Sequence, residues 1–279
     1  MSKLDHLLCP IDQLPLSHTD RTLTCAANHS YDIAKSGYVN LLPVQNKHSK
    51  DPGDSKEMVA ARQALLLSGV YDPIVAFVNQ TLPDALQSRT EIKFLDAGSG
   101  EGHYLRWLKH ELGCRLSATG LDISKWAVTA ASKKSKEITW IVGSNAHIPV
   151  ANEQFDCVMC AFGFPVVDEF SRVLAKDGWL VLVESGPKHL IELREILYPE
   201  IRTFKKTFAD GLDGFTLEYE HQHQFDFHLD SQERISQLLS MTPHIHKAPY
   251  NGRQAAMALQ SIDLTADISV RWFKKQGNT

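Results

Sequence analysis

The chain has 279 residues, long for one domain and short for three. Hydrophobic residues make up 43% and charged residues 22%, so the composition excludes a disordered or collagen-like chain. With 29 Lys and Arg against 33 Asp and Glu, the net charge of −4 argues against a surface that coats nucleic acid along its whole extent, although a local basic patch is compatible with it. No run of about 18 apolar residues and no apolar leader is present, so we expect a soluble, cytoplasmic protein that makes no contact with a membrane.

The N-terminal segment carries two close pairs of metal-binding residue types. Cys9 and Asp12 stand three residues apart, and Cys25 and His29 stand four apart. In a two-knuckle zinc site each pair supplies two ligands, and zinc accepts sulfur, imidazole nitrogen and carboxylate oxygen. Structural sites seldom use a carboxylate where Asp12 stands. The spacing therefore predicts either a closed zinc site or a degenerate knuckle held by packing, with Asp12 capping a turn.

Two short helices are expected between this segment and the rest of the chain. A strand-like run over residues 38–45 is followed by a polar loop over 46–55. Asp54 stands where an N-cap is expected, with an acidic residue three positions later, and Asp72 is followed by a proline at the first helical position. Residues 38–84 thus form a connecting loop with helices.

From about residue 92 onward, apolar strands alternate with helical patterns. Strands are predicted at 92–96, 116–121, 138–142, 155–161 and 179–184. Alternation of this length indicates a parallel, doubly wound α/β sheet. Two later segments, 219–230 and 268–273, alternate in two-residue steps and predict an antiparallel hairpin at the sheet edge. Cys157 and Cys160 fall within one strand on opposite faces, so we interpret them as core residues.

A glycine-rich loop follows the first of these strands. Glycines allow the tight turn and a close approach of the backbone to a ligand. Their spacing, G-x-G-x-G, departs from the dinucleotide pattern and suits S-adenosylmethionine; an acid at the end of the second strand is placed for the ribose hydroxyls, and residues after the third strand for the adenine. The cofactor-binding residues predicted from this pattern are Asp96, Gly98, Gly100, Gly102, Asp122, and Asn145 or Ala146.

Motifs in both halves of the chain carry a resemblance to one family. They are Cys9-Pro10, Cys25-x-x-x-His29, residues 34–45, Asp51-Pro52-Gly53-Asp54-Ser55, Arg62, Gly69-x-Tyr71, residues 95–102 and residues 186–190. With these collinear motifs the chain resembles the bacterial 23S rRNA guanine-N1 methyltransferases. The resemblance implies a Rossmann-like class I methyltransferase domain over 85–279, a zinc-ribbon-like RNA-recognition domain over 1–37, a connector over 38–84, and a homodimer. It also implies that Tyr71, the Gly100-Glu101 turn and His189 contact the cofactor.

The expected reaction is methylation of guanine N1 in a 23S rRNA hairpin loop. The base must be unpaired or flipped out, which fits an aromatic lining by Phe162 and Phe164. Those two residues lie in a Phe-Gly-Phe-Pro loop that departs from the family's aromatic-small-Pro pattern. Asp51 or Asp54 is a candidate acceptor of the N1 proton, although Asp54 is also explained as a helix cap.

RNA contact is expected from one basic cluster beside the N-terminal segment, formed by Lys47, His48 and Lys50. Lysine and arginine clusters further along the chain are interpreted as solvated faces. Two other functions remain open at this point. One is a methyltransferase that acts on a diverged small molecule or protein, and the other is a non-catalytic RNA-binding protein that retains the cofactor fold.

Overall fold

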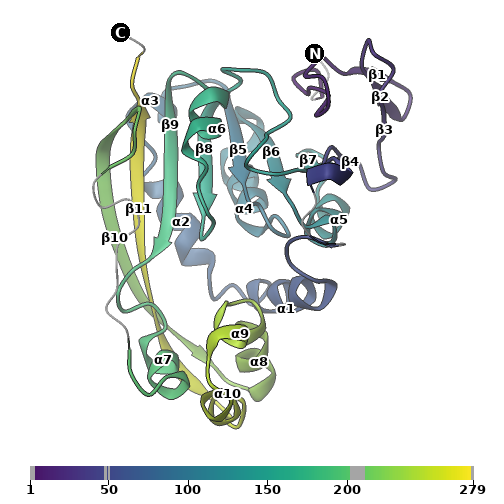
Figure 1. Cartoon of the computed structure of the whole chain (residues 1–279). Coiled ribbons are helices and arrows are strands. Elements are labelled where there is room, and N and C mark those ends of the chain that lie inside the picture. The colour runs from purple at the N-terminus through teal and green to yellow at the C-terminus, as the bar shows by residue number, and fades with distance from the viewer. Residues whose placement is uncertain (1–3, 47–48, 50, 202–210, 278–279) are drawn as a thin grey trace.

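A mixed α/β architecture with one large sheet is seen in the computed structural model, which describes residues 4–46, 49, 51–201 and 211–277. Within these residues the large sheet has eight strands in the order β10-β11-β9-β8-β5-β6-β7-β4 (Figure 1). The strands are β4 (Tyr38–Asn40), β5 (Ile92–Ala97), β6 (Leu116–Asp122), β7 (Thr139–Val142), β8 (Phe155–Ala161), β9 (Leu174–Ser185), β10 (Phe215–Leu229) and β11 (Ile262–Lys275).

Parallel pairing runs from β4 to β9, and the long antiparallel pair of β10 and β11 forms the far edge. The predicted parallel sheet with an antiparallel edge is therefore confirmed, but three described helices join the two edge strands, so they do not form a hairpin. The topology, in which the chain starts at a central strand, moves outward to β7 and then returns through β8 and β9, is that of a class I methyltransferase. It brings the carboxyl ends of β5, β6 and β8 to one edge of the sheet, where ligands bind in doubly wound folds.

Helices pack against the sheet, and others gather beyond one end of it (Figure 1). They are α1 (Lys56–Leu66), α2 (Asp72–Gln80), α3 (Asp84–Gln87), α4 (His103–Leu112), α5 (Lys125–Lys134), α6 (Val167–Val173), α7 (Ile191–Leu197), α8 (Gln232–Ser240), α9 (His244–Lys247) and α10 (Tyr250–Met257), with 3-10 turns at Val44–Asn46 and Gly113–Arg115. Figure 1 shows α7 to α10 gathered at one end of the molecule, with α8 beside α1.

Both predicted helices of the connecting segment form, but each begins one residue away from the predicted cap. Ser55, rather than Asp54, caps α1, and its hydroxyl accepts a hydrogen bond from the Met58 N–H at 3.3 Å. The N-cap of α2 is Tyr71, and Asp72 is already helical. Each aspartate instead bonds another side chain: Asp54 pairs with Arg62 of α1, and Asp72 pairs with His103 of α4.

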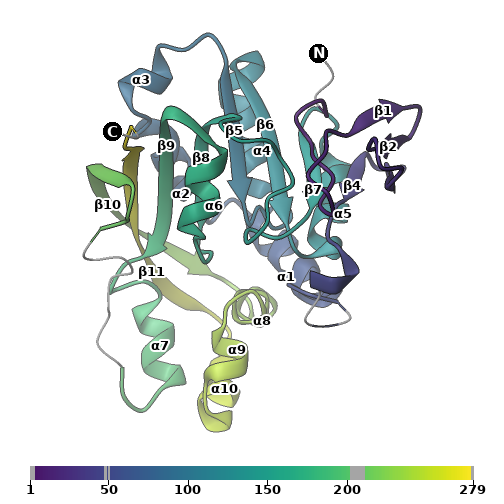
Figure 2. The same ribbon diagram turned by 45° about the horizontal axis from the view of Figure 1, so that its top comes forward.

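The N-terminal ribbon packs onto the large sheet. Its own sheet consists of β1 (Ser17–Thr19), β2 (Thr22–Thr24) and β3 (Ser30–Asp32). Leu7 and Leu23 are fully buried in the same hydrophobic cluster as Leu121 and Phe170 of the main body. Figure 2 shows the ribbon beside β4 and β7. The short ribbon thus obtains a hydrophobic core from the sheet, which a segment of its size lacks by itself.

The strand-like run after the ribbon has a role that the sequence did not predict. Tyr38–Asn40 forms β4 and pairs in parallel with β7, so it extends the main sheet by one strand. Beyond it, Val44–Asn46 turns into a 3-10 helix. The expected connector therefore starts inside the sheet.

Cys157 and Cys160 lie on the two faces of β8, in separate hydrophobic clusters, which confirms their interpretation as core residues. His221 and His223, two residues apart, share a face of β10, and the His223 ring stacks on Phe77 with centroids 4.4 Å apart.

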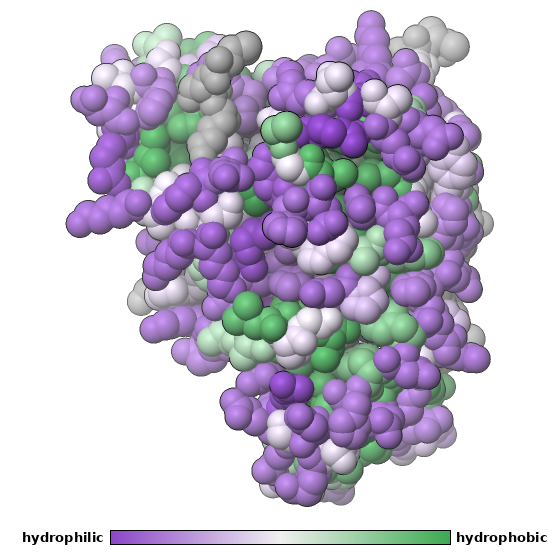
Figure 3. All heavy atoms as spheres, turned by 180° about the vertical axis from the view of Figure 1, so that it is seen from behind, coloured by the Kyte–Doolittle hydropathy of each residue, from purple (hydrophilic) through white to green (hydrophobic). Residues whose placement is uncertain are grey.

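The described helices include none long and apolar enough to cross a membrane. The face in Figure 3 is mainly hydrophilic, with hydrophobic residues visible in separate patches.

Candidate functional site: a cofactor cradle and a four-ligand cluster

The glycine loop between β5 and α4 has a backbone that only glycine adopts easily. Gly98, Gly100 and Gly102 have φ angles of +95°, +55° and +76°, in the region that L side chains rarely enter. A Cβ on Gly102 would also lie 2.9 Å from Cζ3 of Trp140 and closer still to Cη2. The third glycine therefore serves close packing of α4 onto the sheet, while the first two shape the loop.

Two carboxylates flank this loop, Asp96 buried and Asp122 partly buried. Asp122, at the end of β6, accepts hydrogen bonds from the Gly100 N–H and the Ser124 N–H, each at 2.8 Å. Burial raises the pKa of both Asp122 and Asp96; for Asp96, burial and the charge of Asp122 raise the pKa to about 8. A cationic or hydroxyl-bearing ligand would relieve this cost by pairing with the carboxylates.

Two polar atoms beside the loop are buried without a hydrogen-bond partner in the described part of the chain. They are Oγ of Ser99 and Oδ1 of Asn145. The Asn145 side chain also approaches the position that a Cβ on Gly98 would occupy, at 4.0 Å. Since buried polar groups in native proteins are nearly always satisfied, these atoms indicate a polar ligand between the loop and the segment after β7. The residues present therefore fit S-adenosylmethionine, whose hydroxyl and amino groups would supply hydrogen-bond partners for Ser99 and Asn145. Ala146 is exposed at the same segment.

Glu101 occupies a different position from its glycine neighbours. Its side chain is 1% exposed and contacts Lys134 at 2.9 Å and Arg106 at 3.3 Å, with Gln63 at 3.3 Å. The carboxylate thus connects α1, α4 and α5 beneath the loop. The side chain supports the loop, so a cofactor contact at this position would come from the backbone.

An aromatic cluster lies around the carboxyl ends of β5 and β8. The Phe162 ring lies 6.0 Å from His189, at an interplanar angle of 28°, and 6.5 Å from Tyr104. The centroid of the Tyr71 ring lies 6.3 Å from that of His189 and 5.6 Å from that of Phe227. Phe162 has a φ of +53° and is 41% exposed, so a strained backbone aims a partly open ring at this cluster.

Phe164, which the sequence grouped with Phe162, is 92% exposed and makes no ring contact with any described residue. The structure therefore brings only one of the two phenylalanines into the aromatic cluster.

The two candidate proton acceptors lie on the segment that leads into α1. Asp54 Oδ2 accepts from Arg62 at 2.8 Å, and Arg62 also donates to the carbonyl of Met241 at the end of α8. Asp51 lines a cavity of about 30 Å³ together with Ile123 and Trp126. The structure brings both close to the Asp122 end of the site, and neither contacts the aromatic cluster.

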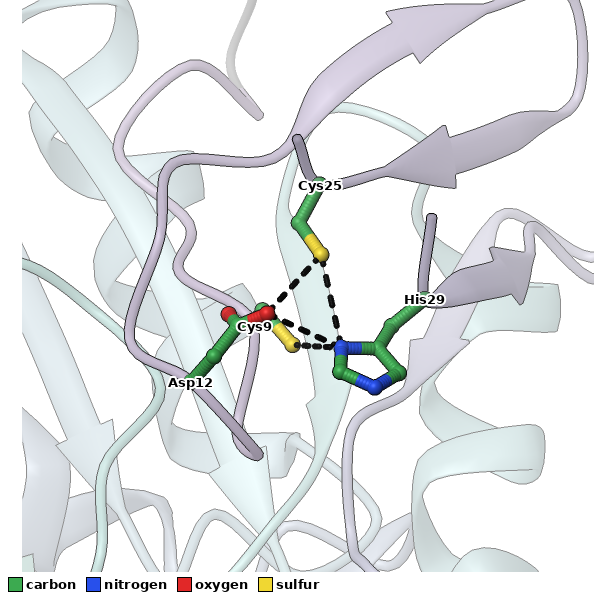
Figure 4. Close-up of side chains that lie close together, drawn as sticks. All are labelled: Cys9, Asp12, Cys25 and His29. Atoms are coloured by element: carbon green, nitrogen blue, oxygen red, sulfur yellow. Dashed lines mark hydrogen bonds and ion pairs between the residues drawn. The ribbon is translucent and has the colours of Figure 1, made fainter. Parts of the chain in front are cut away.

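Cys9, Asp12, Cys25 and His29 converge in the ribbon (Figure 4). One ligand atom from each lies within 4.8 Å of the others. Nδ1 of His29 is 3.6 Å from the Cys9 sulfur and 3.5 Å from the Cys25 sulfur. Asp12 divides its oxygens: Oδ1 accepts from the Leu14 N–H at 3.0 Å, and Oδ2 faces His29 Nδ1 at 2.9 Å and the Cys25 sulfur at 3.2 Å.

This donor set fits zinc. In a tetrahedron with Zn–S of about 2.3 Å and Zn–N of about 2.0–2.1 Å, sulfur and nitrogen lie about 3.5 Å apart. The two sulfur–nitrogen distances given above match that edge. Asp12 combines both functions predicted for it, since one oxygen closes a turn while the other completes the cluster.

The basic cluster expected to contact RNA, Lys47, His48 and Lys50, lies outside the described residues. Among the other clusters, Arg271 is 1% exposed and ion-paired with Glu184, and Lys134 is bound by Glu101. Those two cations are structural.

Sequence reasoning missed three residues of the site. Ser99 stands inside the glycine motif as an unassigned position, and Tyr104 follows it on α4. Both were accessible to the simple rule that residues within or just after a glycine loop face the ligand. Asp267, which binds the loop that carries His189, comes from β11, and no local pattern marks it.

Comparison with known proteins gives matches in both halves. The N-terminal domain described as "RlmA, N-terminal", a zinc ribbon, matches residues 7–50, and a methyltransferase domain matches residues 95–182. The chain is 31% identical to YxjB of Bacillus subtilis, provisionally named a 23S rRNA (guanine-N1)-methyltransferase, over 94% of each chain. It is 30% identical to a Micromonospora griseorubida protein with the same provisional name, over 97% of this chain and 98% of that one. It is 33% identical to the 23S rRNA (guanine-748-N1)-methyltransferase of Streptomyces fradiae, over 69% and 68%.

We call the loop from Asp96 to Gly102, with Asp122 and Asn145 beside it, the cofactor cradle. The sheet topology and this cradle define a class I, S-adenosylmethionine-dependent methyltransferase with an N-terminal zinc ribbon. Given the near full-length similarity to YxjB, the chain belongs to the 23S rRNA (guanine-N1)-methyltransferase family.

Proposed function

We propose that this protein methylates N1 of a guanine in a hairpin loop of 23S rRNA. The observation that carries the proposal is the partly open ring of Phe162, held by a strained backbone beside the cofactor loop and next to His189 and Tyr104. Such a ring offers a stacking surface for a base that has left its helix. The names of the relatives support guanine N1 as the atom.

The cofactor is proposed to lie along the loop from Asp96 to Gly102. Asp122 would accept from the ribose hydroxyls, because each of its oxygens has one hydrogen bond and retains a further lone pair. Asn145 and the backbone of Ala146 would flank the adenine. Tyr71 and His189 would meet the amino-acid end. When bound, S-adenosylmethionine supplies a methyl group activated by its sulfonium.

The protein's contribution to the reaction is alignment. Methyl transfer forms the N1–CH₃ bond and breaks the S–CH₃ bond, and the N1 proton leaves. Phe162 would hold the guanine ring in the plane that points N1 at the methyl carbon, and Tyr104 and His189 would exclude water on either side. Asp54 is held by Arg62, so Asp51 is the proposed proton acceptor, and it would act through water because it does not contact the aromatic cluster. Full methylation by the Asp51→Asn variant would remove Asp51 from this role.

The ribbon is proposed to bind zinc through Cys9, Asp12, Cys25 and His29 and to contact the rRNA hairpin. Its backbone is tied to the segment after β7, through Leu8 N–H to the Pro149 carbonyl at 2.9 Å. Metal binding there would therefore fix the orientation of the ribbon relative to the cofactor site. RNA would lie in the space between the two, with recognition by shape and base contacts.

We further propose that residues 1–37 form the RNA-recognition domain, 38–84 the connector and 85–279 the catalytic domain. A homodimer in the cytoplasm, where rRNA is modified, completes the proposal. Light scattering that gives twice the chain mass would support the dimer, and a monomer at micromolar concentration would contradict it.

The test of function is transfer of labelled methyl from S-adenosylmethionine to 23S rRNA taken from cells that lack this enzyme. Nucleoside mass spectrometry of the product should show 1-methylguanosine within one hairpin. Phe162→Ala should lower the rate by about a hundredfold, since a stacking contact is worth about 1–3 kcal/mol, while binding of the cofactor product S-adenosylhomocysteine stays intact. Phe164→Ala is the matched control and should retain most activity. Absence of label in rRNA with intact cofactor binding would favour a diverged substrate.

A further inference from the structure

The loop that carries His189 is attached to a buried carboxylate on the neighbouring strand. Asp267 of β11 is 6% exposed, and its Oδ2 accepts a hydrogen bond from the Lys188 N–H at 2.9 Å. Its backbone carbonyl accepts from the Gly186 N–H at 2.7 Å. A Cβ on Gly186 would lie 2.5 Å from the carboxylate oxygens, so the loop crosses Asp267 where only glycine fits. One residue therefore holds the loop by its backbone and by its side chain.

The same residue determines which nitrogen of His189 carries the proton. The backbone N–H of Asp267 donates to Nδ1 of His189 at 3.3 Å. In a neutral imidazole the nitrogen that accepts leaves the other protonated, so Nε2 carries the hydrogen. Burial, opposed by the charge of Asp267 and reinforced by His244 and Arg194, lowers the pKa of His189 to about 4. The ring is therefore neutral at physiological pH.

Because Nδ1 faces the backbone of β11, Nε2 lies on the other side of the ring. The centroid of the His189 ring lies 6.0 Å from that of Phe162 and 6.3 Å from that of Tyr71, and no hydrogen bond to Nε2 from a described residue is present. A fixed N–H donor at this position is suited to an anionic oxygen, because charge-assisted hydrogen bonds are about twice as strong as neutral ones. S-adenosylmethionine carries one anionic group, its carboxylate.

We propose that Asp267 is a positioning residue that presents His189 as a neutral Nε2–H donor to the carboxylate of the cofactor. The proposal rests on the proposed function, since it assigns one part of the same cofactor site. Asp267 acts through the loop 186–189 and does not itself touch the ligand. We therefore expect binding of the amino-acid end of the cofactor, and not of its adenosine end, to depend on Asp267 of β11.

The experiment compares two probes in calorimetry. S-adenosylhomocysteine has the amino-acid end, and 5′-methylthioadenosine lacks it. Asp267→Ala should lower the affinity for S-adenosylhomocysteine by about tenfold or more, the loss typical of a hydrogen bond to a charged group. The affinity for methylthioadenosine should stay within about twofold of the wild-type value. Asp267→Asn, whose amide oxygen can accept from the Lys188 N–H, should recover most of the affinity.

The matched control is Asp263→Ala on the same strand. Asp263 is an exposed aspartate that pairs with His228, so both probes should bind that variant as they bind the wild type. Equal weakening of both probes by Asp267→Ala would overturn the proposal and make Asp267 a general structural residue. Failure of the wild type to bind either probe would instead contradict the proposed function.

Two further variants keep the test decisive if Asp267→Ala does not fold. His189→Gln retains an N–H donor and His189→Phe retains only the ring, so the first should keep more of the preference for S-adenosylhomocysteine than the second. Nitrogen-15 shifts of His189 in the wild type should report protonation at Nε2 from pH 6 to pH 8. Protonation at Nδ1, or equal losses of preference in the two His189 variants, would contradict the assignment.

Discussion

The cofactor cradle and the four-ligand cluster both gather polar side chains, but they are built in different ways. In the cradle, Asp96 and Asp122 stand at the ends of adjacent parallel strands, so the sheet itself fixes their spacing. In the ribbon, Cys9 and Cys25 sit in turns beside three-residue strands. The cradle is therefore preformed by the fold, whereas the ribbon cluster depends on packing against the main body and, in our proposal, on a bound metal.

The protein should lose stability if the close packing around the glycine loop of the cradle is disturbed. Gly102→Ala puts a methyl group against Trp140 and into a left-handed backbone, and it should destabilise folding by about 3 kcal/mol, or more than a hundredfold in the equilibrium constant. Gly214→Ala is the control, since Gly214 has a φ of +77° with nothing within 4 Å of the Cβ position. It should cost about 1 kcal/mol. Urea unfolding measures both, and equal losses would show that backbone strain alone accounts for Gly102.

Removal of the support beneath the loop should have a smaller effect. Glu101→Gln leaves Arg106 and Lys134 without their buried partner, and we expect a loss of about 2 kcal/mol in the free energy of unfolding. S-adenosylhomocysteine affinity at temperatures where the variant is folded should change little. A large loss of affinity with unchanged stability would mean that the Glu101 side chain contacts the cofactor.

The ribbon should depend on its ligands without the cradle being affected. Cys25→Ser should lower the zinc content of purified protein from about one equivalent to below about a tenth, because a hydroxyl is a poor zinc ligand. Cys114→Ser, at an exposed free cysteine, is the control. S-adenosylhomocysteine affinity should stay within about twofold in both, while rRNA methylation falls only in Cys25→Ser. Equal zinc content in the two variants would refute the site.

The cradle should also respond to pH through Asp96. Its pKa, raised from an ordinary 3.8 to about 8, means that the folded protein retains a proton that the unfolded chain releases. The contribution of Asp96 to stability is therefore fully present below about pH 4 and is lost as pH rises through about 8. A cationic cofactor favours the carboxylate, so its affinity should rise several-fold from pH 6.5 to pH 8.5. Calorimetry on Asp96→Asn, which retains only the cofactor's own titration, should show a flatter profile.

The same contrast explains which features the sequence could predict. The strand ends that carry Asp96 and Asp122 were predictable because local periodicity and glycine spacing define them. Phe162 was a candidate because it stands in the loop after the strand predicted at 155–161. Asp267 was not predictable, because its hydrogen bond to His189 joins residues 78 positions apart in the sequence. The strand-like run that contains β4 was predicted, but its parallel pairing with β7 was not, since that pairing joins residues about 100 positions apart. The caps were predicted one residue away because the side chain of Asp54 pairs with Arg62 of α1 and that of Asp72 pairs with His103 of α4, instead of capping the helix ends.

The central claim is tested most directly by measuring 1-methylguanosine in 23S rRNA from cells with and without this gene. We expect mass spectrometry of the rRNA fragments to show one hairpin guanine methylated at N1 in the parent, unmethylated in the deletion strain, and restored by the wild-type gene but not by the Phe162→Ala variant. An identical 1-methylguanosine content in parent and deletion strain would contradict the assignment.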